Sequence, residues 1–577
     1  FHAFGALLLR QHGQRLGLDP QFAILSDDDQ HTLLKQARPD FKQTEIDQAL
    51  ALISRAKNLL LTRDLLESNA EFPEFLDFPH FPSVFHAYET ALRAGQAVDF
   101  DDLILLPVRL LETHADLLEA VQQTFRWISV DEYQDVNLAQ YRLLRLLAGG
   151  GANVCVIGDP DQAIYGFRGA DRRYFLSFQQ DYPDAQVLSL SQNYRSTQLI
   201  LDAAMQVIGR MAEGGGTPPL QAVEALADFA EQVKLDVYTA PTDKAEAEYV
   251  VHQIEQMVGG TSYFSLDSGR VEGAQQVTAR SFADFAVLYR LGAQSRLLVE
   301  AFERSGIPYQ TIGQTPLAAH KAVREALVAL WLLHTPQSPV HREVVLAVVG
   351  LDKAKELAGK EGNWGELRGI EGSSGKLAPV ARRRMAALAA FWQEIEQARQ
   401  AGATTARLVE RVHEFMSQQR AEPLNEADDE RLRQLARRAV PWETDLAGFL
   451  EAMALQSETD AYDPRADRVT LMTLHAAKGL EFPMVFIVGC EEGLLPYERP
   501  GKPVDVDEER RLFYVGVTRA QHRLVLLSAR TRFLFGQRRD NAPSRFVGDI
   551  ADALKQVQAM QHRSARPRPE AEQLSLF

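Results

Sequence analysis

The feature that most constrains the fold is a set of short β-rich runs in two groups, separated by a long helical stretch. Between about residues 96 and 190, "FRWISV", "ANVCVIG" and "AQVLSLSQNYRS" alternate with segments of helical periodicity. "DFAVLYR" precedes the helix-rich stretch 319–463, and "PMVFIVG" follows it. Apolar runs that alternate with helices are typical of buried parallel strands. The pattern predicts an α/β fold whose sheet is interrupted by a helical insertion and then completed.

Length and composition exclude several classes of protein. A chain of 577 residues is too long for one core, and ~150 residues per domain gives about four domains. No apolar run approaches the ~18–20 residues of a membrane span. The two cysteines, Cys155 and Cys490, exclude a disulfide framework and point to a reducing cytoplasm. The net charge of −16 does not favour nucleic acid, so a DNA-binding prediction must depend on specific residues.

A carboxylate pair, Asp131 and Glu132, follows the apolar run "WISV". At the end of a parallel strand, such a pair can bind Mg²⁺ and activate water beside a nucleotide phosphate. This chemistry normally uses a loop of the form G-x-x-x-x-G-K-[ST]. The candidate "GSSGKL" fails, because Ile370 and Leu377 occupy the positions of the first glycine and the hydroxyl residue. The phosphate loop that should accompany the pair is therefore absent from these residues.

Other segments give the acid pair its context. In chain order they are "FHAF", "VDFDDLI", "SVDEYQDVN", "VIGDPDQAIYGFRGAD", "SLSQNYRST", "TLHAAKGLEFPMVFIVGCEEGLLP" and "EERRLFYVGVTRA". This ordered set resembles the motifs of superfamily 1 helicases of the UvrD/Rep/PcrA family. The resemblance extends from Phe1 to about Val547 and is dense except in the helical stretches.

The resemblance implies two RecA-like parallel-sheet cores of the P-loop NTPase type, each with an inserted helical domain. The expected parts are a first core (1–8 and 87–189), its helical insertion (9–86), a second core (190–318 and 464–550), its helical insertion (319–463) and a flexible tail (551–577). In the family the phosphate loop precedes the motif that "FHAF" resembles. We therefore expect Phe1 to begin after that loop, and residues 1–577 alone not to hydrolyse ATP appreciably.

The resemblance also implies roles at an ATP and Mg²⁺ site. Asp131 is expected to bind Mg²⁺, Glu132 to position and deprotonate the attacking water, and Gln162 to sense the γ-phosphate. Arg195 and Arg519 match two arginines that reach the γ-phosphate, where bidentate guanidinium groups disperse negative charge. Further matches are Tyr194 for stacking on adenine, Glu481 for the ribose, and, more weakly, Arg510 and Tyr514.

For single-stranded DNA the resemblance implies aromatic platforms and phosphate contacts. Aromatic side chains can stack on bases of any sequence. The matching residues are His2, Phe100, Tyr165, Phe167, Thr473, His475, Tyr497 and Phe535. The family usually has a tryptophan at the position of Phe167, so the stacking surface here is smaller. It commonly has a histidine at the position of Tyr497, and a tyrosine cannot take a proton-dependent role of the same kind. The segment "TPLAAHKAVREAL" replaces a phenylalanine-rich basic segment of the second insertion.

The last five residues, "QLSLF", match the short peptide by which bacterial proteins bind the replicative sliding clamp. Leu576 and Phe577 would enter an apolar pocket, and Gln573 would form a hydrogen bond at its edge, with Leu574 between them. The alternative is a tail that folds back on its own domain. The match also indicates a bacterial source.

Together these features predict an ATP-dependent 3′–5′ DNA helicase of DNA repair or replication, acting on single strands and duplex junctions. Two alternatives stay open: a helicase–nuclease subunit of the RecB/AddA type, and a catalytically inactive DNA-binding protein tethered to the clamp.

Overall fold

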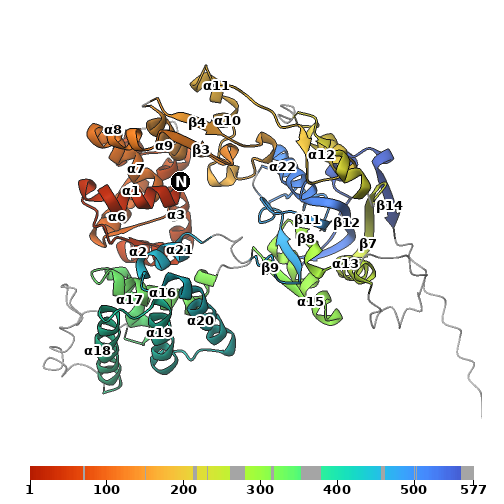
Figure 1. The fold of residues 1–577 in the computed structure, drawn as a ribbon. Helices are drawn as coiled ribbons and strands as arrows, with labels where there is room; N and C mark the ends of the chain where they lie inside the picture. The colour runs from red at the N-terminus through yellow and green to blue at the C-terminus, as the bar shows by residue number, and fades with distance from the viewer. Residues whose placement is uncertain are drawn as a thin grey trace, which may run out of the picture.

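The computed structural model describes residues 1–68, 72–149, 151–211, 218–229, 232–259, 280–313, 317–351, 379–456, 462–499, 501 and 503–559. In Figure 1 these residues form two lobes. We call the described parts of 1–182 and 317–456 the helical lobe, and those of 192–313 and 462–559 the sheet lobe. A search of the described helices found none with the length and apolar character to cross a membrane.

The sheet lobe is built on an eight-stranded sheet in the order β14-β7-β12-β11-β8-β10-β9, with β13 paired to β12. All neighbouring strands are parallel except β12 and β13. The strands are β7 (Leu235–Thr242), β8 (Phe285–Tyr289), β9 (Tyr309–Ile312), β10 (Val469–Thr473), β11 (Phe482–Ile487), β12 (Ala520–Leu534), β13 (Gln537–Asp540) and β14 (Lys555–Ala559). Strands from both sides of the stretch 319–463 enter it, so the prediction of an interrupted parallel sheet is confirmed.

Helices cover both faces of this sheet, as a doubly buried parallel sheet requires. They are α12 (Gln198–Ile208), α13 (Asp243–Val258), α15 (Ser295–Ser305), α22 (Val506–Val517) and the short α23 (Arg545–Gly548). Successive side chains of a strand point to opposite faces. Ala286 and Leu288 accordingly join the core with α12 and α22, whereas Phe285 and Val287 join the core with α13 and α15.

One expected boundary needs correction. The flexible tail was expected to begin at residue 551, but Lys555–Ala559 form β14, an edge strand paired in parallel with β7. The strand is short and polar, "KQVQA", so its sequence carries little strand signal. The sheet therefore extends into the region that the sequence assigns to the tail.

The helical lobe contains a much smaller sheet. In the described residues β3 (Trp127–Val130) and β4 (Asn153–Val156) pair only with each other, in parallel. The third expected strand, "AQVLSLSQNYRS", is wrong for most of its length. Only β5 (Gln192–Asn193) forms, paired with β6 (Gln221–Ala222). Leu190 is 87% exposed, because no neighbouring strand in the described chain covers this segment.

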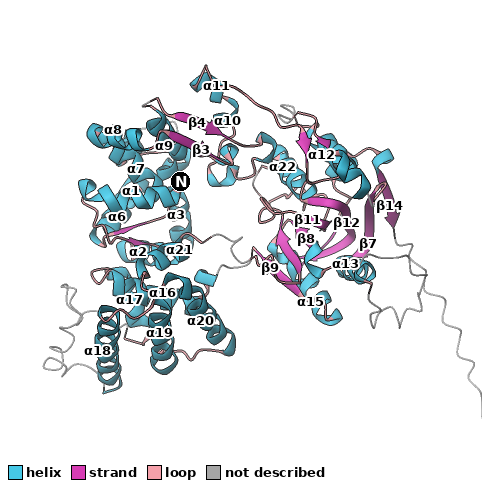
Figure 2. Cartoon of the chain, viewed as in Figure 1, coloured by secondary structure: helices cyan, strands magenta, loops and turns pink. Residues whose placement is uncertain are grey.

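Helices make up most of the rest of this lobe, as Figure 2 shows. Around β3 and β4 they are α1 (His2–His12), α7 (Asp102–Thr113), α8 (Ala115–Thr124), α9 (Leu138–Ala148), α10 (Arg173–Leu176) and α11 (Phe178–Asp181). The first helical stretch contains α2 (Asp27–Ala37), α3 (Gln43–Asn58), α4 (Arg63–Ser68), α5 (Pro73–Leu76) and α6 (Phe81–Ala94). The second contains α16 (Lys321–His334), α17 (Pro339–Val348), α18 (Pro379–Gln400), α19 (Thr405–Gln419), α20 (Glu426–Ala439) and α21 (Leu446–Ala454).

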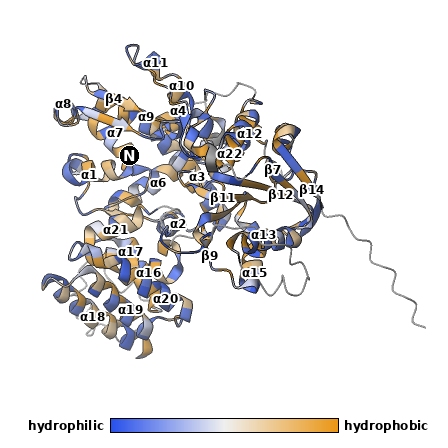
Figure 3. Cartoon of the chain, turned by 45° about the vertical axis from the view of Figure 1, so that its right-hand side comes forward, coloured by the Kyte–Doolittle hydropathy of each residue, from blue (hydrophilic) through white to orange (hydrophobic). Residues whose placement is uncertain are grey.

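The two helical stretches, far apart in sequence, share one hydrophobic core with α1, α7 and α9. Helix α2 packs against α17, and Arg10 of α1 forms an ion pair with Glu451 of α21 at 2.7 Å. Hydrophilic and hydrophobic sides alternate around these helices in Figure 3. An apolar stripe indicates that a face is buried but not what buries it, so the shared core could not be predicted.

A buried ion cluster closes the base of the first helical stretch. There β1 (Ala23–Ile24) pairs with β2 (Ala97–Val98). The Lys57 ammonium lies 2.6 Å from Asp99, 2.9 Å from Asp102 and 2.7 Å from Glu89. Burial lowers the pKa of Lys57, but the three carboxylates outweigh it and raise the pKa above its usual value. This cluster joins α3 and α6 to the start of α7.

Candidate functional site

The acid pair lies at the C-terminal end of β3, as expected. Asp131 accepts a hydrogen bond through Oδ1 from the Glu132 amide at 2.9 Å. Glu132 has φ +53°, an uncommon conformation for a residue other than glycine. Its side chain is about half exposed and accepts a hydrogen bond through Oε2 from Gln134 Nε2 at 2.5 Å. The turn thus presents a carboxylate to the space beyond the strand.

The loop after β4 stands beside this turn. The buried Gln134 accepts a hydrogen bond from the Asp159 amide at 3.1 Å, which ties the two loops together. A Cβ atom at Gly158 would lie 2.2 Å from Gln134 Oε1, so the close approach requires glycine. Asp159 in turn accepts a hydrogen bond from Gln162 Nε2 at 2.9 Å. The side chain of Gln162 is therefore held at the edge of the acid pair.

Arg519 reaches this position from the sheet lobe. Its Nη2 donates to Gln162 Oε1 at 3.4 Å, and its Nε donates to the Val515 carbonyl at 2.9 Å. The residue is 2% exposed. Its pKa is lowered to about 10, mainly by burial and then by the charge of Arg195, whereas Tyr514, Glu132 and Glu481 act in the opposite direction. Arg519 stays protonated at neutral pH in this mixed field.

Printed contacts bring the neighbouring charges to the same place. Arg519 Nη1 donates to the carbonyl of Leu480, next to Glu481, at 3.2 Å. Lys478 contacts both the Gln162 carbonyl and Glu132. Arg195 Nε donates to Glu481 Oε2 at 2.5 Å, and Gln521 Nε2 donates to Glu481 Oε1 at 3.0 Å. Beside them the ring of Tyr194 is 73% exposed. The four side chains Glu132, Gln162, Arg195 and Arg519 therefore converge on one site, which both lobes supply.

The donor set at β3 suits Mg²⁺ only as part of a phosphate site. No group of three or more His, Cys, Asp or Glu that could hold a metal occurs within the ranges that the structure describes. Mg²⁺ at phosphate sites is commonly held by one or two carboxylates, with phosphate oxygens and waters completing the shell. Asp131, an exposed carboxylate at a strand end, has the required chemistry.

A group of aromatic residues lies close to this site. The rings of Tyr165 and Phe167 are 6.1 Å apart, and His475 meets Phe167 edge-on at 5.6 Å. The Arg168 guanidinium lies 5.6 Å from the centre of the Tyr165 ring. Phe167 is 65% exposed. Burial lowers the pKa of His475 to about 4, with smaller contributions from the charges of Arg290 and Arg168, so the imidazole is neutral at pH 7.

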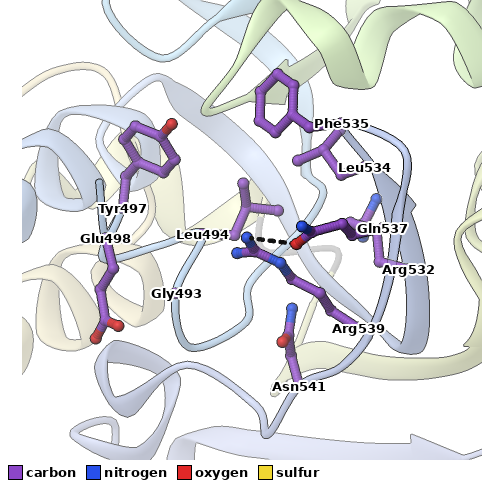
Figure 4. A pocket seen from close by; sticks show the side chains of 10 residues that line it. All are labelled: Gly493, Leu494, Tyr497, Glu498, Arg532, Leu534, Phe535, Gln537, Arg539 and Asn541. Carbon is purple, nitrogen blue, oxygen red and sulfur yellow. Dashed lines mark hydrogen bonds between the residues drawn. The ribbon is translucent and has the colours of Figure 1, made fainter. Parts of the chain in front are cut away.

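Two further aromatic pairs occupy other positions. His2 stacks on Phe100 with ring centres 3.8 Å apart and planes at 29°. Tyr497 and Phe535 line a cavity of about 290 Å³, shown in Figure 4. They come from the segment after β11 and from the turn between β12 and β13. Arg539 also lines the cavity and donates to Gln537 at 3.4 Å. Thr473 accepts a hydrogen bond from the Ala476 amide at 3.1 Å and so shapes the turn that carries His475.

Comparisons with known proteins agree with these motifs. The UvrD/REP helicase N-terminal domain matches residues 1–183, and the UvrD-like helicase C-terminal domain matches 188–354 and 370–531. The chain is 34% identical over 589 residues to the ATP-dependent DNA helicase PcrA of Leuconostoc citreum, covering 96% of this chain and 74% of that protein. The PcrA proteins of Staphylococcus epidermidis and Staphylococcus aureus are 33% and 32% identical, each with 96% of this chain and 76% of the relative covered.

The chain belongs to the UvrD/PcrA-type helicase family. The recognition from motifs and the predicted fold class are thereby confirmed. These three relatives are PcrA proteins, and they give the helicase–nuclease alternative no support.

Some expected site residues of this UvrD/PcrA-type helicase lie elsewhere. Arg510 is buried, donates to the Val207 carbonyl at 3.0 Å and pairs with Asp549, while its guanidinium lies 4.9 Å from the centre of the Phe546 ring. These contacts belong to the core of the sheet lobe, so the nucleotide role of Arg510 stays a prediction without structural support. The clamp-binding peptide, residues 573–577, lies outside the described residues.

Sequence reasoning missed two cations that join the lobes. Arg511, next to Arg510, donates through Nε to the Ala163 carbonyl at 2.8 Å. Lys478 donates to the Gln162 carbonyl at 2.8 Å and lies 3.3 Å from Glu132. Both residues lie inside the recognised motifs. For Lys478, the pattern that could have indicated it is a lysine directly before a glycine in "AAKGLEF".

Proposed function

We propose that this chain is the motor part of an ATP-dependent DNA helicase. It moves 3′ to 5′ along single-stranded DNA and opens duplex junctions, in DNA repair or replication in the bacterial cytoplasm. The observation that carries the proposal is the hydrogen bond from Arg519 of one lobe to Gln162 of the other, at a position where Lys478 contacts both the Gln162 carbonyl and Glu132. A site shared between lobes allows nucleotide binding and hydrolysis to change their separation.

In the proposed site each side chain has one task. Asp131 binds Mg²⁺, which supplies charge neutralisation to the phosphates. Glu132 orients and deprotonates the attacking water, while Gln162 reports on the γ-phosphate. Arg195 and Arg519 stabilise charge on the transferred group, a contribution of ~10³–10⁵ in rate. The exposed Tyr194 and the nearby Glu481 receive the adenosine.

The phosphate-binding segment is the missing part of this proposal. Within residues 1–577 no sequence satisfies G-x-x-x-x-G-K-[ST]. Trp127 on β3 is 81% exposed. Apolar strand residues of this kind are normally covered. We propose that a strand bearing the phosphate loop adds to β3 and β4, and that residues 1–577 alone do not hydrolyse ATP appreciably.

An ATPase assay of residues 1–577, with and without single-stranded DNA and Mg²⁺, tests this step. The expected result is no DNA-stimulated turnover above that of a Glu132→Gln variant. Strong DNA-stimulated turnover that Glu132→Gln abolishes would show that these residues suffice and would overturn the fragment proposal. The complete gene product tests the motor itself, because displacement of streptavidin from the 5′ but not the 3′ end of an oligonucleotide indicates 3′–5′ movement.

The proposal includes a protein partner. Residues 573–577 would bind the sliding clamp and tether the motor to replicating or repaired DNA. A pull-down with the clamp tests this, with Leu576→Ala and Phe577→Ala together as the variant and Leu574→Ala, between the anchors, as the milder comparison. Equal capture of all three proteins would contradict it. If the clamp is bound but the complete gene product lacks ATPase activity, the alternative of an inactive clamp-tethered DNA-binding protein is favoured instead.

A further inference from the structure

One short turn of the sheet lobe touches both halves of the proposed machinery. Residues 474–480 follow β10, and Gly479 adopts φ +82°, which favours glycine. His475, near the start of the turn, meets the exposed ring of Phe167 edge-on. Lys478, near its end, reaches Glu132. Only Ala476 and Ala477 therefore separate the residue that contacts the aromatic platform from the residue that contacts Glu132.

Lys478 forms an unusually complete set of contacts for a lysine. Its ammonium donates to the Gln162 carbonyl at 2.8 Å, lies 3.3 Å from Glu132 Oε2 and pairs with Asp135. It also lies 5.4 Å from the centre of the Tyr165 ring. The side chain is 7% exposed. An ammonium removed from water is costly unless it is paired, and these contacts offset the cost of burying Lys478.

The carboxylates share this single cation unequally. Asp135 is largely buried, and burial raises its pKa although Lys478 opposes that shift. Glu132 is about half exposed, so it can exchange Lys478 for water at lower cost than Asp135 can. The Lys478–Glu132 contact is therefore the one in this set that can break most easily.

The other end of the turn lies where single-stranded DNA is proposed to bind. A base stacked on Phe167 would compete with the edge of His475 for the face or rim of that ring. A phosphate near Tyr165 would attract the Lys478 ammonium away from Glu132. Either event would displace one end of the turn. The amides of Ala476 and Ala477 donate hydrogen bonds to Thr473, so the turn moves as one unit.

We propose that Lys478 is a positioning residue that restrains Glu132 in the DNA-free protein and releases it when single-stranded DNA occupies the Tyr165–Phe167 platform. This inference rests on the proposed function. While the contact holds, the ammonium competes with water for the carboxylate that must act as base. Because coupling between two sites is reciprocal, a change at Glu132 must also alter DNA affinity.

Reciprocity provides a test that needs no ATP hydrolysis. Fluorescence anisotropy would measure binding of a labelled oligo(dT) of about 16 nucleotides to residues 1–577. Glu132→Gln weakens the restraint, so we expect DNA to bind about 5-fold more tightly. In a Lys478→Met background the same change should have less than about a 2-fold effect, because the partner is absent. Lys478→Arg, which keeps the charge, should restore at least part of the response.

Controls separate failure of this inference from failure of the proposed function. Glu112→Gln removes a carboxylate of the same lobe that pairs with Arg142, and should have no effect in either background. Phe167→Ala tests the platform itself. Suppose that DNA binds and that Phe167→Ala weakens binding. If Glu132→Gln then changes the DNA affinity equally in both backgrounds, or in neither, the restraint by Lys478 is refuted while the proposed function stands. If the chain does not bind DNA, or Phe167→Ala has no effect, the proposed DNA path fails and this inference fails with it.

Discussion

Two sheets of the described chain, the eight-stranded sheet and the pair β3–β4, have strands of apolar sequence but very different burial. In β8, "FAVLY", every residue is buried, whereas in β3, "WISV", only Val130 is buried. The difference lies in the neighbours, because β8 has strands on both sides and helices on both faces. Within the described chain β3 has one partner strand. Strand sequence thus indicates what a segment can bury, and the rest of the sheet decides whether it does.

The same difference in burial distinguishes the two groups of residues that form the candidate site. Arg519 and Lys478 come from the lobe with the eight-stranded sheet, and both are nearly buried. Asp131 and Glu132 come from the end of a strand that is mostly exposed. The second group therefore has less packing to fix its geometry, and contacts such as Gln134 to Asp159 carry more of the positioning.

The largest expected effect compares the two sheets directly. Phe486, near the C-terminal end of β11, is fully buried, so Phe486→Ala should lower the free energy of unfolding by about 3–5 kcal/mol. Trp127→Ala on β3 is the matched control and should change it by less than about 0.5 kcal/mol, because the side chain is 81% exposed. Urea denaturation followed by circular dichroism measures both. A cost for Trp127→Ala that equals the cost for Phe486→Ala would mean that β3 is covered in solution.

The second prediction concerns the buried ion cluster of the helical lobe, whose small sheet is mostly exposed. Lys57→Met removes the cation from a buried cluster with Asp99, Asp102 and Glu89, and should cost about 3 kcal/mol because the carboxylates lose their partner. Arg63→Met, which removes an exposed ion pair with Glu67, should cost less than about 1 kcal/mol. Similar costs for the two variants would show that water reaches the cluster. The measurement is the same denaturation experiment.

Much of this architecture could be predicted from sequence because it depends on local pattern. Alternating apolar runs and helices predicted the sheet lobe, and ordered motifs predicted that Gln162 and Arg519 belong to one site. The segment "VLSL" at 187–190 failed because a strand also needs a neighbour. The shared core of the helical stretches and the role of Lys478 depend on which surfaces meet, and a single sequence does not encode that in any local pattern.

The third prediction moves from stability to DNA. Phe167 lies on the platform with its ring mostly exposed, so Phe167→Ala should leave folding intact and weaken oligo(dT) binding by about 1–3 kcal/mol. Leu190→Ala alters a residue that is even more exposed but lies outside the platform, and should leave affinity unchanged. Anisotropy titrations of both variants at one salt concentration compare them. An equal loss in both would indicate that exposed apolar surface in general, rather than the platform, binds the oligonucleotide.

The smallest expected effect is a pH dependence at the turn that joins the lobes. In the folded protein His475 has a pKa of about 4, whereas in the unfolded chain the imidazole has its usual value of ~6.5. The unfolded state therefore binds a proton between these values and the native state does not. The stability that neutral His475 contributes is complete above pH ~6.5 and is lost as the pH falls toward 4.

His475→Asn removes this titration and keeps a polar side chain of similar reach. Between pH 7 and pH 5, the variant should lose roughly 1–2 kcal/mol less unfolding free energy than the wild type. Denaturation midpoints at the two pH values give the comparison, and the other histidines contribute equally to both proteins. Identical pH dependence would mean that water reaches the imidazole beside Phe167. The two lobes would then be less closely joined at this turn than the contact between His475 and Phe167 indicates.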